Sequence, residues 1–201
     1  MSAYSISQAH PFLFLESLYL TVFRLPFPSI LLYNHYMIIG FQTKLKVNKK
    51  QLAVLAQHAG TARHAYNQGL ALCKEVLKHN RVNPEDKIKF PSAIDLHKWL
   101  IASIKARLPW YYEVSKCAPQ YALRSLSDAF KAFFKKLRGF PNFKKKGRND
   151  SFTLDGSIHV DHHKVKVPVI GWVKTYERLP HGVKPKSVTI SRQAERKVYL
   201  I

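Results

Sequence analysis

The hydrophobic and polar positions follow two different periods, and the change falls near residue 150. From Asn48 to Leu77, apolar residues recur every three or four positions, which is the repeat of an amphipathic α-helix. Asn48 lies three positions before Gln51, the spacing of a capping box that begins a helix. Gly60 and Gly69 interrupt this pattern, and we expect them to weaken or bend the helix.

Two further helices are predicted before the period changes. Ser92 and Asp95 have the spacing of a second capping box, and Pro109 ends the helix that they begin. The third helix starts near Pro119, and Gly139 is its expected C-terminal cap. Its apolar stripe is the cleanest in the sequence and consists of Leu123, Leu126, Phe130, Phe133, Phe134 and Leu137.

After residue 150, apolar and polar residues alternate as they do in β-strands. Asp155–Gly156 is a strong hairpin signal, and residues 37–47 alternate in the same way. The predicted fold class is therefore α+β, a helical bundle inserted into a small antiparallel β-barrel. Its parts are a first strand at 37–47, a helical lobe at 48–139, a basic loop at 140–150 and the remaining strands at 151–201, truncated at the C-terminus.

Residues 1–36 differ from the rest in composition, with one Arg, one Glu and no Lys. They lack a basic start, and Glu16, Arg24, Pro26 and Pro28 interrupt any signal core or membrane-spanning helix. We interpret this stretch as a poorly structured extension, translated from upstream sequence, and expect the working protein to begin at Met37.

The charge is strongly positive, with 33 Lys and Arg against 12 Asp and Glu and a formal net charge of +21. All of the excess follows Met37. Such a field attracts polyanions, nucleic acid first and anionic membranes second. We expect phosphate contacts from a group on the third helix, opposite its Phe stripe, and from a second group in the basic loop. The first group is Lys131, Lys135, Lys136 and Arg138, and the second is Lys144, Lys145, Lys146 and Arg148.

Two aromatic residues of the basic loop, Phe140 and Phe143, flank Pro141. They could either anchor the loop or stack on an unpaired base, whereas the phenylalanines of the third helix have core spacing.

The sequence carries no pattern typical of a catalytic or metal site. The acidic residues Asp155, Asp161, Glu177 and Glu195 are expected in turns and hairpins, without the clustering that divalent ions require. His159, His162 and His163 are interpreted as part of a solvated turn, and Cys73 and Cys117 as reduced, buried thiols in a cytosolic protein. No catalytic residue, metal or cofactor is assigned to the chain.

Three ordered segments together resemble one family. They are GTARHAYNQGL (60–70), APQYALRSLSDAFKAFFKKLRGFPNFKKKGRNDSFTL (118–154) and KVKVPVIGWVKTYERLP (164–180). They are similar to the TnpB or OrfB group of transposon-encoded proteins, whose N-terminal region is catalogued as a helix-turn-helix domain of transposases. The resemblance covers about residues 37–201.

This resemblance implies an RNA-guided DNA nuclease with a wedge-type barrel and a helical recognition lobe. Its partners would be DNA and a guide RNA in the cytoplasm, without a membrane. Arg63, Tyr66 and Asn67 match the first-helix signature and would help to hold RNA or DNA, although Tyr66 also lies on the core stripe and Asn67 could be a buried hydrogen-bonding residue.

The family's catalytic Asp-Glu-Asp set, which binds magnesium, and its zinc ribbon follow the region matched here. The expected function is therefore nucleic-acid binding by a truncated fragment that is catalytically silent alone. Two alternatives stay open: the N-terminal half of a split or recoded nuclease completed by a downstream frame, and a polybasic protein that binds RNA or a membrane surface.

Overall fold

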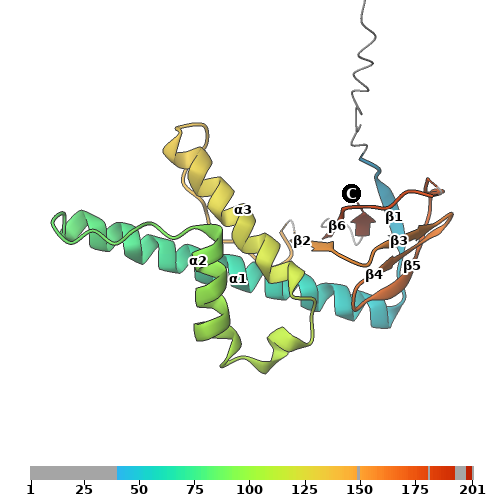
Figure 1. Cartoon of the computed structure of the whole chain (residues 1–201). Coiled ribbons are helices and arrows are strands. Elements are labelled where there is room, and N and C mark those ends of the chain that lie inside the picture. Colours follow the sequence, from blue (N-terminus) through green and yellow to red (C-terminus); the bar gives the residue numbers. More distant parts are fainter. Residues whose placement is uncertain (1–39, 149, 181, 193–197, 201) are drawn as a thin grey trace, which may run out of the picture. The chain divides into compact units, whose positions relative to one another are not determined.

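The described part of the chain is a set of helices enclosed in sequence by strands, as the change of period predicts. The computed structural model describes residues 40–148, 150–180, 182–192 and 198–200. The predictions for residues 1–36 and for Glu195 lie outside these residues. The helices are α1 (Lys49–Val82), α2 (Ala93–Trp99) and α3 (Cys117–Phe134), and the strands are β1 (Thr43–Lys46), β2 (Asp150–Asp155), β3 (His159–Asp161), β4 (Lys164–Val167), β5 (Gly171–Thr175), β6 (Ser187–Arg192) and β7 (Val198–Leu200) (Figure 1).

Helix α1 begins at the predicted capping box. The Asn48 side chain accepts from the Gln51 N–H at 2.8 Å, and the Gln51 side chain accepts from the Asn48 N–H at 3.1 Å. The helix is continuous through both glycines. Gly69 allows a close helix contact, because a Cβ there would lie 2.7 Å from Leu123 Cδ2 and 3.0 Å from Leu126 Cδ2 of α3.

Helix α2 also begins where its capping box predicts, with the Ser92 hydroxyl accepting from the Asp95 N–H at 3.3 Å. It continues into a π-helical segment, Leu100–Lys105, before the chain turns. The predicted end at Pro109 is wrong, because the helical segment already ends at Lys105, and Pro109 instead starts a short 3-10 helix, Pro109–Tyr112, that leads towards α3.

Helix α3 ends at Phe134, earlier than the predicted end near Gly139. Lys136 adopts the left-handed conformation with φ 60°, and the N–H groups of Lys136 and Leu137 donate to carbonyl oxygens of the last turn at 2.8 and 2.9 Å. This is the Schellman arrangement, in which a residue just after the helix reverses the chain. Lys136 occupies the left-handed position that glycine usually occupies after a helix. The Leu137 side chain that follows is 73% exposed.

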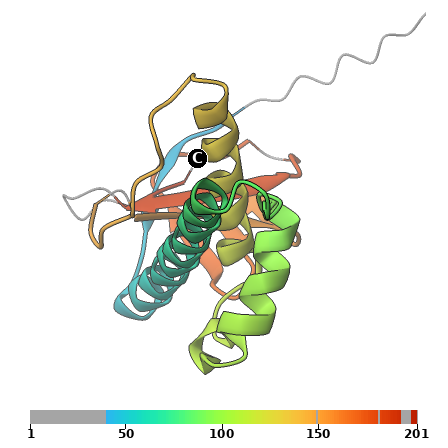
Figure 2. The same ribbon diagram turned by 90° about the vertical axis from the view of Figure 1, so that its left-hand side faces the viewer.

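The strands form one antiparallel sheet in the order β2-β6-β7-β1-β5-β4-β3. Strands β2 and β3 are its edges, so the described strands make an open sheet and the predicted closed barrel is not confirmed. In Figures 1 and 2, α3 crosses α1 with α2 beside it, and the strands lie towards the N-terminal part of α1. The Gln51 side chain ties that end of α1 to β5 by donating to the Trp172 carbonyl at 2.9 Å.

The hairpin prediction at Asp155–Gly156 is wrong in its pairing. Gly156 does turn the chain with φ 93°, but β2 pairs with β6 and β3 pairs with β4. The buried face of β2 packs on the helices instead, and the Phe152 ring contacts the His58 ring of α1 at 5.2 Å between centroids. The two-residue hairpin instead lies between β3 and β4.

The core is shared by α1, α3 and one face of the sheet. Fully buried side chains from all three meet in one cluster, which includes Leu70, Leu123, Phe130, Leu154 and Val173. No described helix is both long enough and apolar enough to cross a membrane.

Candidate nucleic-acid interface

The basic loop, residues 140–150, is fixed to α1 by an amide side chain. Asn67 Nδ2 donates to the Lys144 carbonyl at 3.0 Å, and the Lys144 N–H donates to Asn67 Oδ1 at 2.8 Å. The amide therefore satisfies both backbone groups of Lys144, as a neighbouring strand would. Asn67, predicted as a nucleic-acid contact, holds the loop that carries the other predicted contacts.

The end of the basic loop is fixed by an ion pair. Arg63 Nη1 lies 2.5 Å from Asp150 Oδ1, with 20% and 11% of the two side chains exposed. The other Asp150 oxygen accepts from the Gly147 N–H at 3.0 Å, where the chain turns with φ 77°. Arg63 is also predicted as a nucleic-acid contact, but its guanidinium group is paired with the carboxylate of Asp150 within the loop.

Lys144 differs from the rest of its lysine run because it is turned inward. Its Nζ lies 4.4 Å from the centre of the Tyr66 ring, a cation–π contact. Burial lowers the pKa of Lys144, although Asp150 opposes the shift, and burial raises the pKa of Tyr66. Tyr66 is itself a core residue, 7% exposed. The two residues pack against each other beneath the loop.

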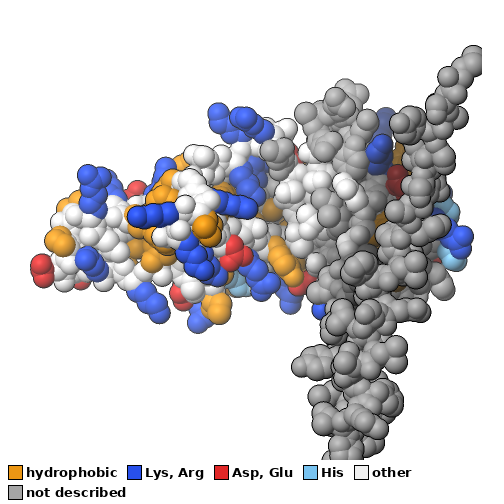
Figure 3. Space-filling model, turned by 90° about the horizontal axis from the view of Figure 1, so that it is seen from above, with side chains coloured by type: hydrophobic (Ala, Val, Ile, Leu, Met, Phe, Trp, Pro, Cys, Tyr) orange, Lys and Arg blue, Asp and Glu red, His pale blue; other side chains and the backbone are white. Residues whose placement is uncertain are grey.

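The remaining cations of the two predicted groups are exposed. The group assigned to one face of the third helix is not on that face, because only Lys131 belongs to α3 and it pairs with Asp128 at 3.0 Å. The early end of α3 places the others at its C-cap and beyond. Within the described residues, no ion pair involves the exposed set Lys135, Lys136, Arg138, Lys145, Lys146 and Arg148. Figure 3 views this end of the molecule and shows Lys and Arg side chains among hydrophobic ones.

The two aromatic residues of the basic loop have different surroundings. Phe140 anchors the loop, because its ring meets the Phe130 and Phe133 rings of α3 edge-on at 5.5 and 5.1 Å. Phe143 is 48% exposed, and Lys74 Nζ of α1 lies 4.8 Å from its ring centre. An exposed ring beside cations can stack on a base, so this function stays open for Phe143.

A second cationic surface, absent from the sequence predictions, lies on the exposed face of β1, β5 and β4. Lys46 and Lys164 each pair directly with Lys174, which places three lysines in one row across three strands. Like charges directly opposite one another destabilise a sheet. Asp161 offsets part of this repulsion by contacting Lys164 at 3.1 Å. We call this row, with the exposed side chains of Lys166, Trp172 and Tyr176, the lysine face.

Aromatic rings lie among these lysines. Lys46 Nζ is 4.5 Å from the Tyr176 ring centre, and Lys164 Nζ is 4.9 Å from that of Trp172. The signal was present in the sequence, since KVKV and GWVKTY alternate exposed Lys or aromatic residues with buried ones. The row itself depends on strand register, which the sequence pattern does not specify.

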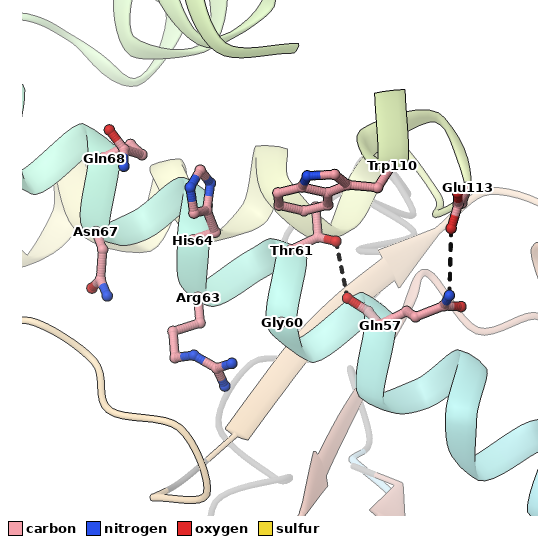
Figure 4. A pocket seen from close by; sticks show the side chains of 9 residues that line it. All are labelled: Gln57, Gly60, Thr61, Arg63, His64, Asn67, Gln68, Trp110 and Glu113. Atoms are coloured by element: carbon pink, nitrogen blue, oxygen red, sulfur yellow. Dashed lines mark hydrogen bonds between the residues drawn. The ribbon is translucent and has the colours of Figure 1, made fainter. Parts of the chain in front are cut away.

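An open pocket of about 580 Å³ runs along α1 beside the basic loop (Figure 4). Arg63 and Asn67 point to the loop side, whereas His64 and Gln68 point to the other side. Trp110 and Glu113, from the segment between α2 and α3, form the far wall. The Tyr111 hydroxyl lies 2.8 Å from His64 Nδ1, and burial lowers the pKa of His64.

The acidic residues and histidines lie only partly where they were predicted, because Asp155 ends strand β2 and His159 begins strand β3. Asp155 accepts from the Cys117 thiol at 2.7 Å and the Tyr121 hydroxyl at 3.0 Å, and these bonds lower its pKa. His162 and His163 form the β3–β4 turn. Within the described ranges, no group of three or more His, Cys, Asp or Glu side chains is arranged to hold a metal ion.

Comparisons with known proteins agree with the three segments that resemble one family. Residues 37–81 match the family HTH_OrfB_IS605, described as a helix-turn-helix domain. The chain is 30% identical over 157 residues to "Putative RNA-guided DNA endonuclease InsQ" of Escherichia coli (strain K12), covering 76% of this chain and 37% of that protein. It is 27% identical over 161 residues to a protein of the same descriptive name, MT2953, from Mycobacterium tuberculosis (strain CDC 1551 / Oshkosh), covering 71% and 35%.

These matches define a class of transposon-encoded proteins related to RNA-guided endonucleases. The chain is similar to the N-terminal region of TnpB/OrfB proteins. It spans little more than a third of the length of the curated relatives that it matches. The range that matches the helix-turn-helix family contains β1 and, up to residue 81, the single helix α1 among its described residues.

Proposed function

We propose that this chain binds nucleic acid as the DNA- and guide-RNA-holding part of an RNA-guided DNA endonuclease, acting in the cytoplasm. The observation that carries the proposal is the fixed basic loop. Asn67 holds the loop backbone at Lys144 and Arg63 holds the carboxylate of Asp150, so Lys145, Lys146 and Arg148 are presented outward from a loop that is already ordered. Ordering a loop before binding lowers the entropic cost of the complex. Cations that project from such a loop bind phosphates more tightly than the same cations on a flexible tail.

The lysine face supports the same function. Three lysines in register cost folding free energy, and a polyanion laid across them would remove that repulsion. Its rings, Trp172 and Tyr176, are 44% and 58% exposed and can stack on unpaired bases. The name RNA-guided DNA endonuclease, carried by the relatives, supports RNA and DNA as the two polyanions.

Arg63, Tyr66 and Asn67 have a positioning role in this proposal. Their contacts run to the basic loop, so their replacement would weaken binding by releasing the loop rather than by removing a phosphate contact. Direct phosphate contacts are assigned to the exposed cations of the loop and the end of α3. Lys144 is excluded from that set because it is half-buried over Tyr66.

The salt dependence of binding tests this proposal. Affinity for a 20-nucleotide single-stranded RNA and for a DNA duplex would be measured by fluorescence anisotropy at several salt concentrations. The slope of log K against log[salt] is negative. Replacing Lys145, Lys146 and Arg148 with Gln should make it shallower, by about 0.7 per lost contact for single strands and about 0.9 for duplex DNA.

A matched variant controls for the change in net charge. Replacing Arg81, Lys87 and Lys89, which are exposed around the α1–α2 connection, removes the same charge away from the basic loop. This control should leave the slope nearly unchanged. Equal slopes for the two triple variants would refute the role of the loop, and displacement of RNA by anionic lipid vesicles would favour a membrane-surface protein instead.

A further inference from the structure

The pocket along α1 has hydrogen-bond acceptors at one end. Gln57 Nε2 donates to Glu113 Oε2 at 3.4 Å, which turns the amide nitrogen towards the carboxylate. Gln57 Oε1 and the second Glu113 oxygen make no hydrogen bond to any described residue. Both side chains line the pocket, so each offers it one acceptor oxygen, and two such acceptors suit a ligand that presents two neighbouring N–H donors.

The wall of the pocket is a tryptophan ring in a fixed position. The Trp110 ring meets the His64 ring edge-on at 5.2 Å and lies 4.4 Å from the Tyr111 ring, measured between centroids. The hydrogen bond between His64 and the Tyr111 hydroxyl holds these rings together. A rigid aromatic wall is a surface on which a planar base can stack.

The floor of the pocket allows a flat ligand to come close to the helix. Gly60 lies on this side of α1, and a Cβ there would meet nothing nearer than Arg63 Nη2 at 3.9 Å. The volume of about 580 Å³ is within the range of roughly 300–1,000 Å³ that is usual for small-ligand sites. A single base, rather than a stacked duplex, fits such a space.

The charges favour a base over a phosphate inside the pocket. Glu113 repels phosphate, and the charge of Arg63 is already paired with Asp150. The phosphates of a bound strand would instead lie on the basic loop, which adjoins the pocket because Arg63 and Asn67 line the pocket and also contact the loop. Base and backbone thus have separate, adjacent sites.

We infer that this pocket binds one unstacked guanine of a nucleic-acid strand, and this inference rests on the proposed function. The guanine ring stacks on Trp110, and its N1–H and N2–H₂ groups donate to Gln57 and Glu113. Adenine and cytosine offer only one such donor group beside an acceptor, and uracil offers a single N–H between two acceptors. The site is therefore selective for guanine.

A test uses inosine, which lacks only the 2-amino group of guanine. Two nine-nucleotide uridine strands, one with a central guanosine and one with a central inosine, would be compared by anisotropy on the full chain. Guanosine should bind about tenfold more tightly, the effect of one hydrogen bond to a charged acceptor. The same comparison would be made with deoxyribose versions of both strands. The guanosine-to-inosine affinity ratio should reach its full value only with the sugar of the natural ligand, which shows whether RNA or DNA supplies the base.

Glu113→Gln should bring the guanosine-to-inosine ratio close to one. The matched control, Glu75→Gln, removes the same charge from an exposed position of α1 and should raise both affinities equally while leaving the ratio unchanged. A second readout is tryptophan fluorescence: the guanosine strand should quench wild-type emission, and Trp110→Phe should remove that component.

The outcomes separate the inference from the proposed function. Equal affinity of guanosine and inosine strands for the wild type, with salt-dependent binding of both, would overturn the guanine pocket and leave the basic loop in place. Equal ratios in Glu113→Gln and Glu75→Gln would also overturn it. Failure of every strand to bind at low salt would overturn both.

Discussion

Replacing the two glycines of α1 by alanine separates helix propensity from helix packing within one helix. Gly69→Ala would place a methyl group 2.7 Å from Leu123 Cδ2 and 3.0 Å from Leu126 Cδ2. Both leucines are 0% exposed, so their side chains have little room to move. Gly60→Ala would place the same methyl group in open space, with its nearest neighbour at 3.9 Å.

The magnitudes follow from two opposing effects. Alanine is favoured over glycine in a helix interior by about 0.8–1.0 kcal/mol, and this gain applies at both positions. Adding a methyl group to a packed core costs about 1–3 kcal/mol, and this cost applies only at Gly69. We therefore expect Gly60→Ala to stabilise the protein by about 0.5–1 kcal/mol and Gly69→Ala to destabilise it by about 1 kcal/mol.

Urea unfolding followed by circular dichroism at 222 nm would measure both variants. The difference between their free energies of unfolding, about 2 kcal/mol, isolates the packing cost at the contact between α1 and α3. If Gly69→Ala proved as stabilising as Gly60→Ala, the helices would not be in the close contact described, and the reason given for glycine at this position would be wrong.

The remaining predictions concern the lysine row, the loop attachment and pH. Lys174→Gln should raise the free energy of unfolding by about 0.5 kcal/mol at low salt, with the gain lost at high salt, while weakening RNA binding; a loss of stability at low salt would contradict the repulsion. Asn67→Ala should cost about 1–2 kcal/mol and remove hydrogen-exchange protection from the Lys144 N–H; unchanged protection would show that another group holds the loop. Burial lowers the pKa of His58 below its ordinary value of 6.5, so the unfolded chain binds more protons as pH falls below that value. Stability should be greatest above pH 6.5 and decrease on acidification, and an NMR titration that placed the pKa of His58 at or above 6.5 would refute this.

The helices could be predicted from the sequence because their signals are local. Both capping boxes depend on residues three positions apart, and the structure has them where the spacing predicts. The end of α3 was missed because the left-handed residue is Lys136, and nothing local distinguishes it from a helical lysine. The pairing of β2 was missed because its partner, β6, lies far along the chain, and the local Asp155–Gly156 signal carries no information about that partner.

The candidate site was predicted in outline but not in its division of roles. Lys144, Lys145 and Lys146 are equivalent in sequence, and only the tertiary structure turns the first of them over Tyr66. Asn67 has the same residue type whether it binds a phosphate or a neighbouring peptide group. The lysine face was overlooked because its residues belong to three strands that are separated along the chain and come together only through register.

The attachment of the basic loop has a consequence for how the protein can change. Asn67 bonds to the main-chain N–H and carbonyl of residue 144, groups that every residue except proline supplies in full. The side chains at positions 145, 146 and 148 take no part in that attachment. Substituting these side chains can therefore change which nucleic-acid strands the protein binds, and with what affinity, without detaching the loop from α1. The exposed side chains of the loop can therefore change while its attachment to α1 stays the same. This property suits both divergence among related proteins and deliberate redesign.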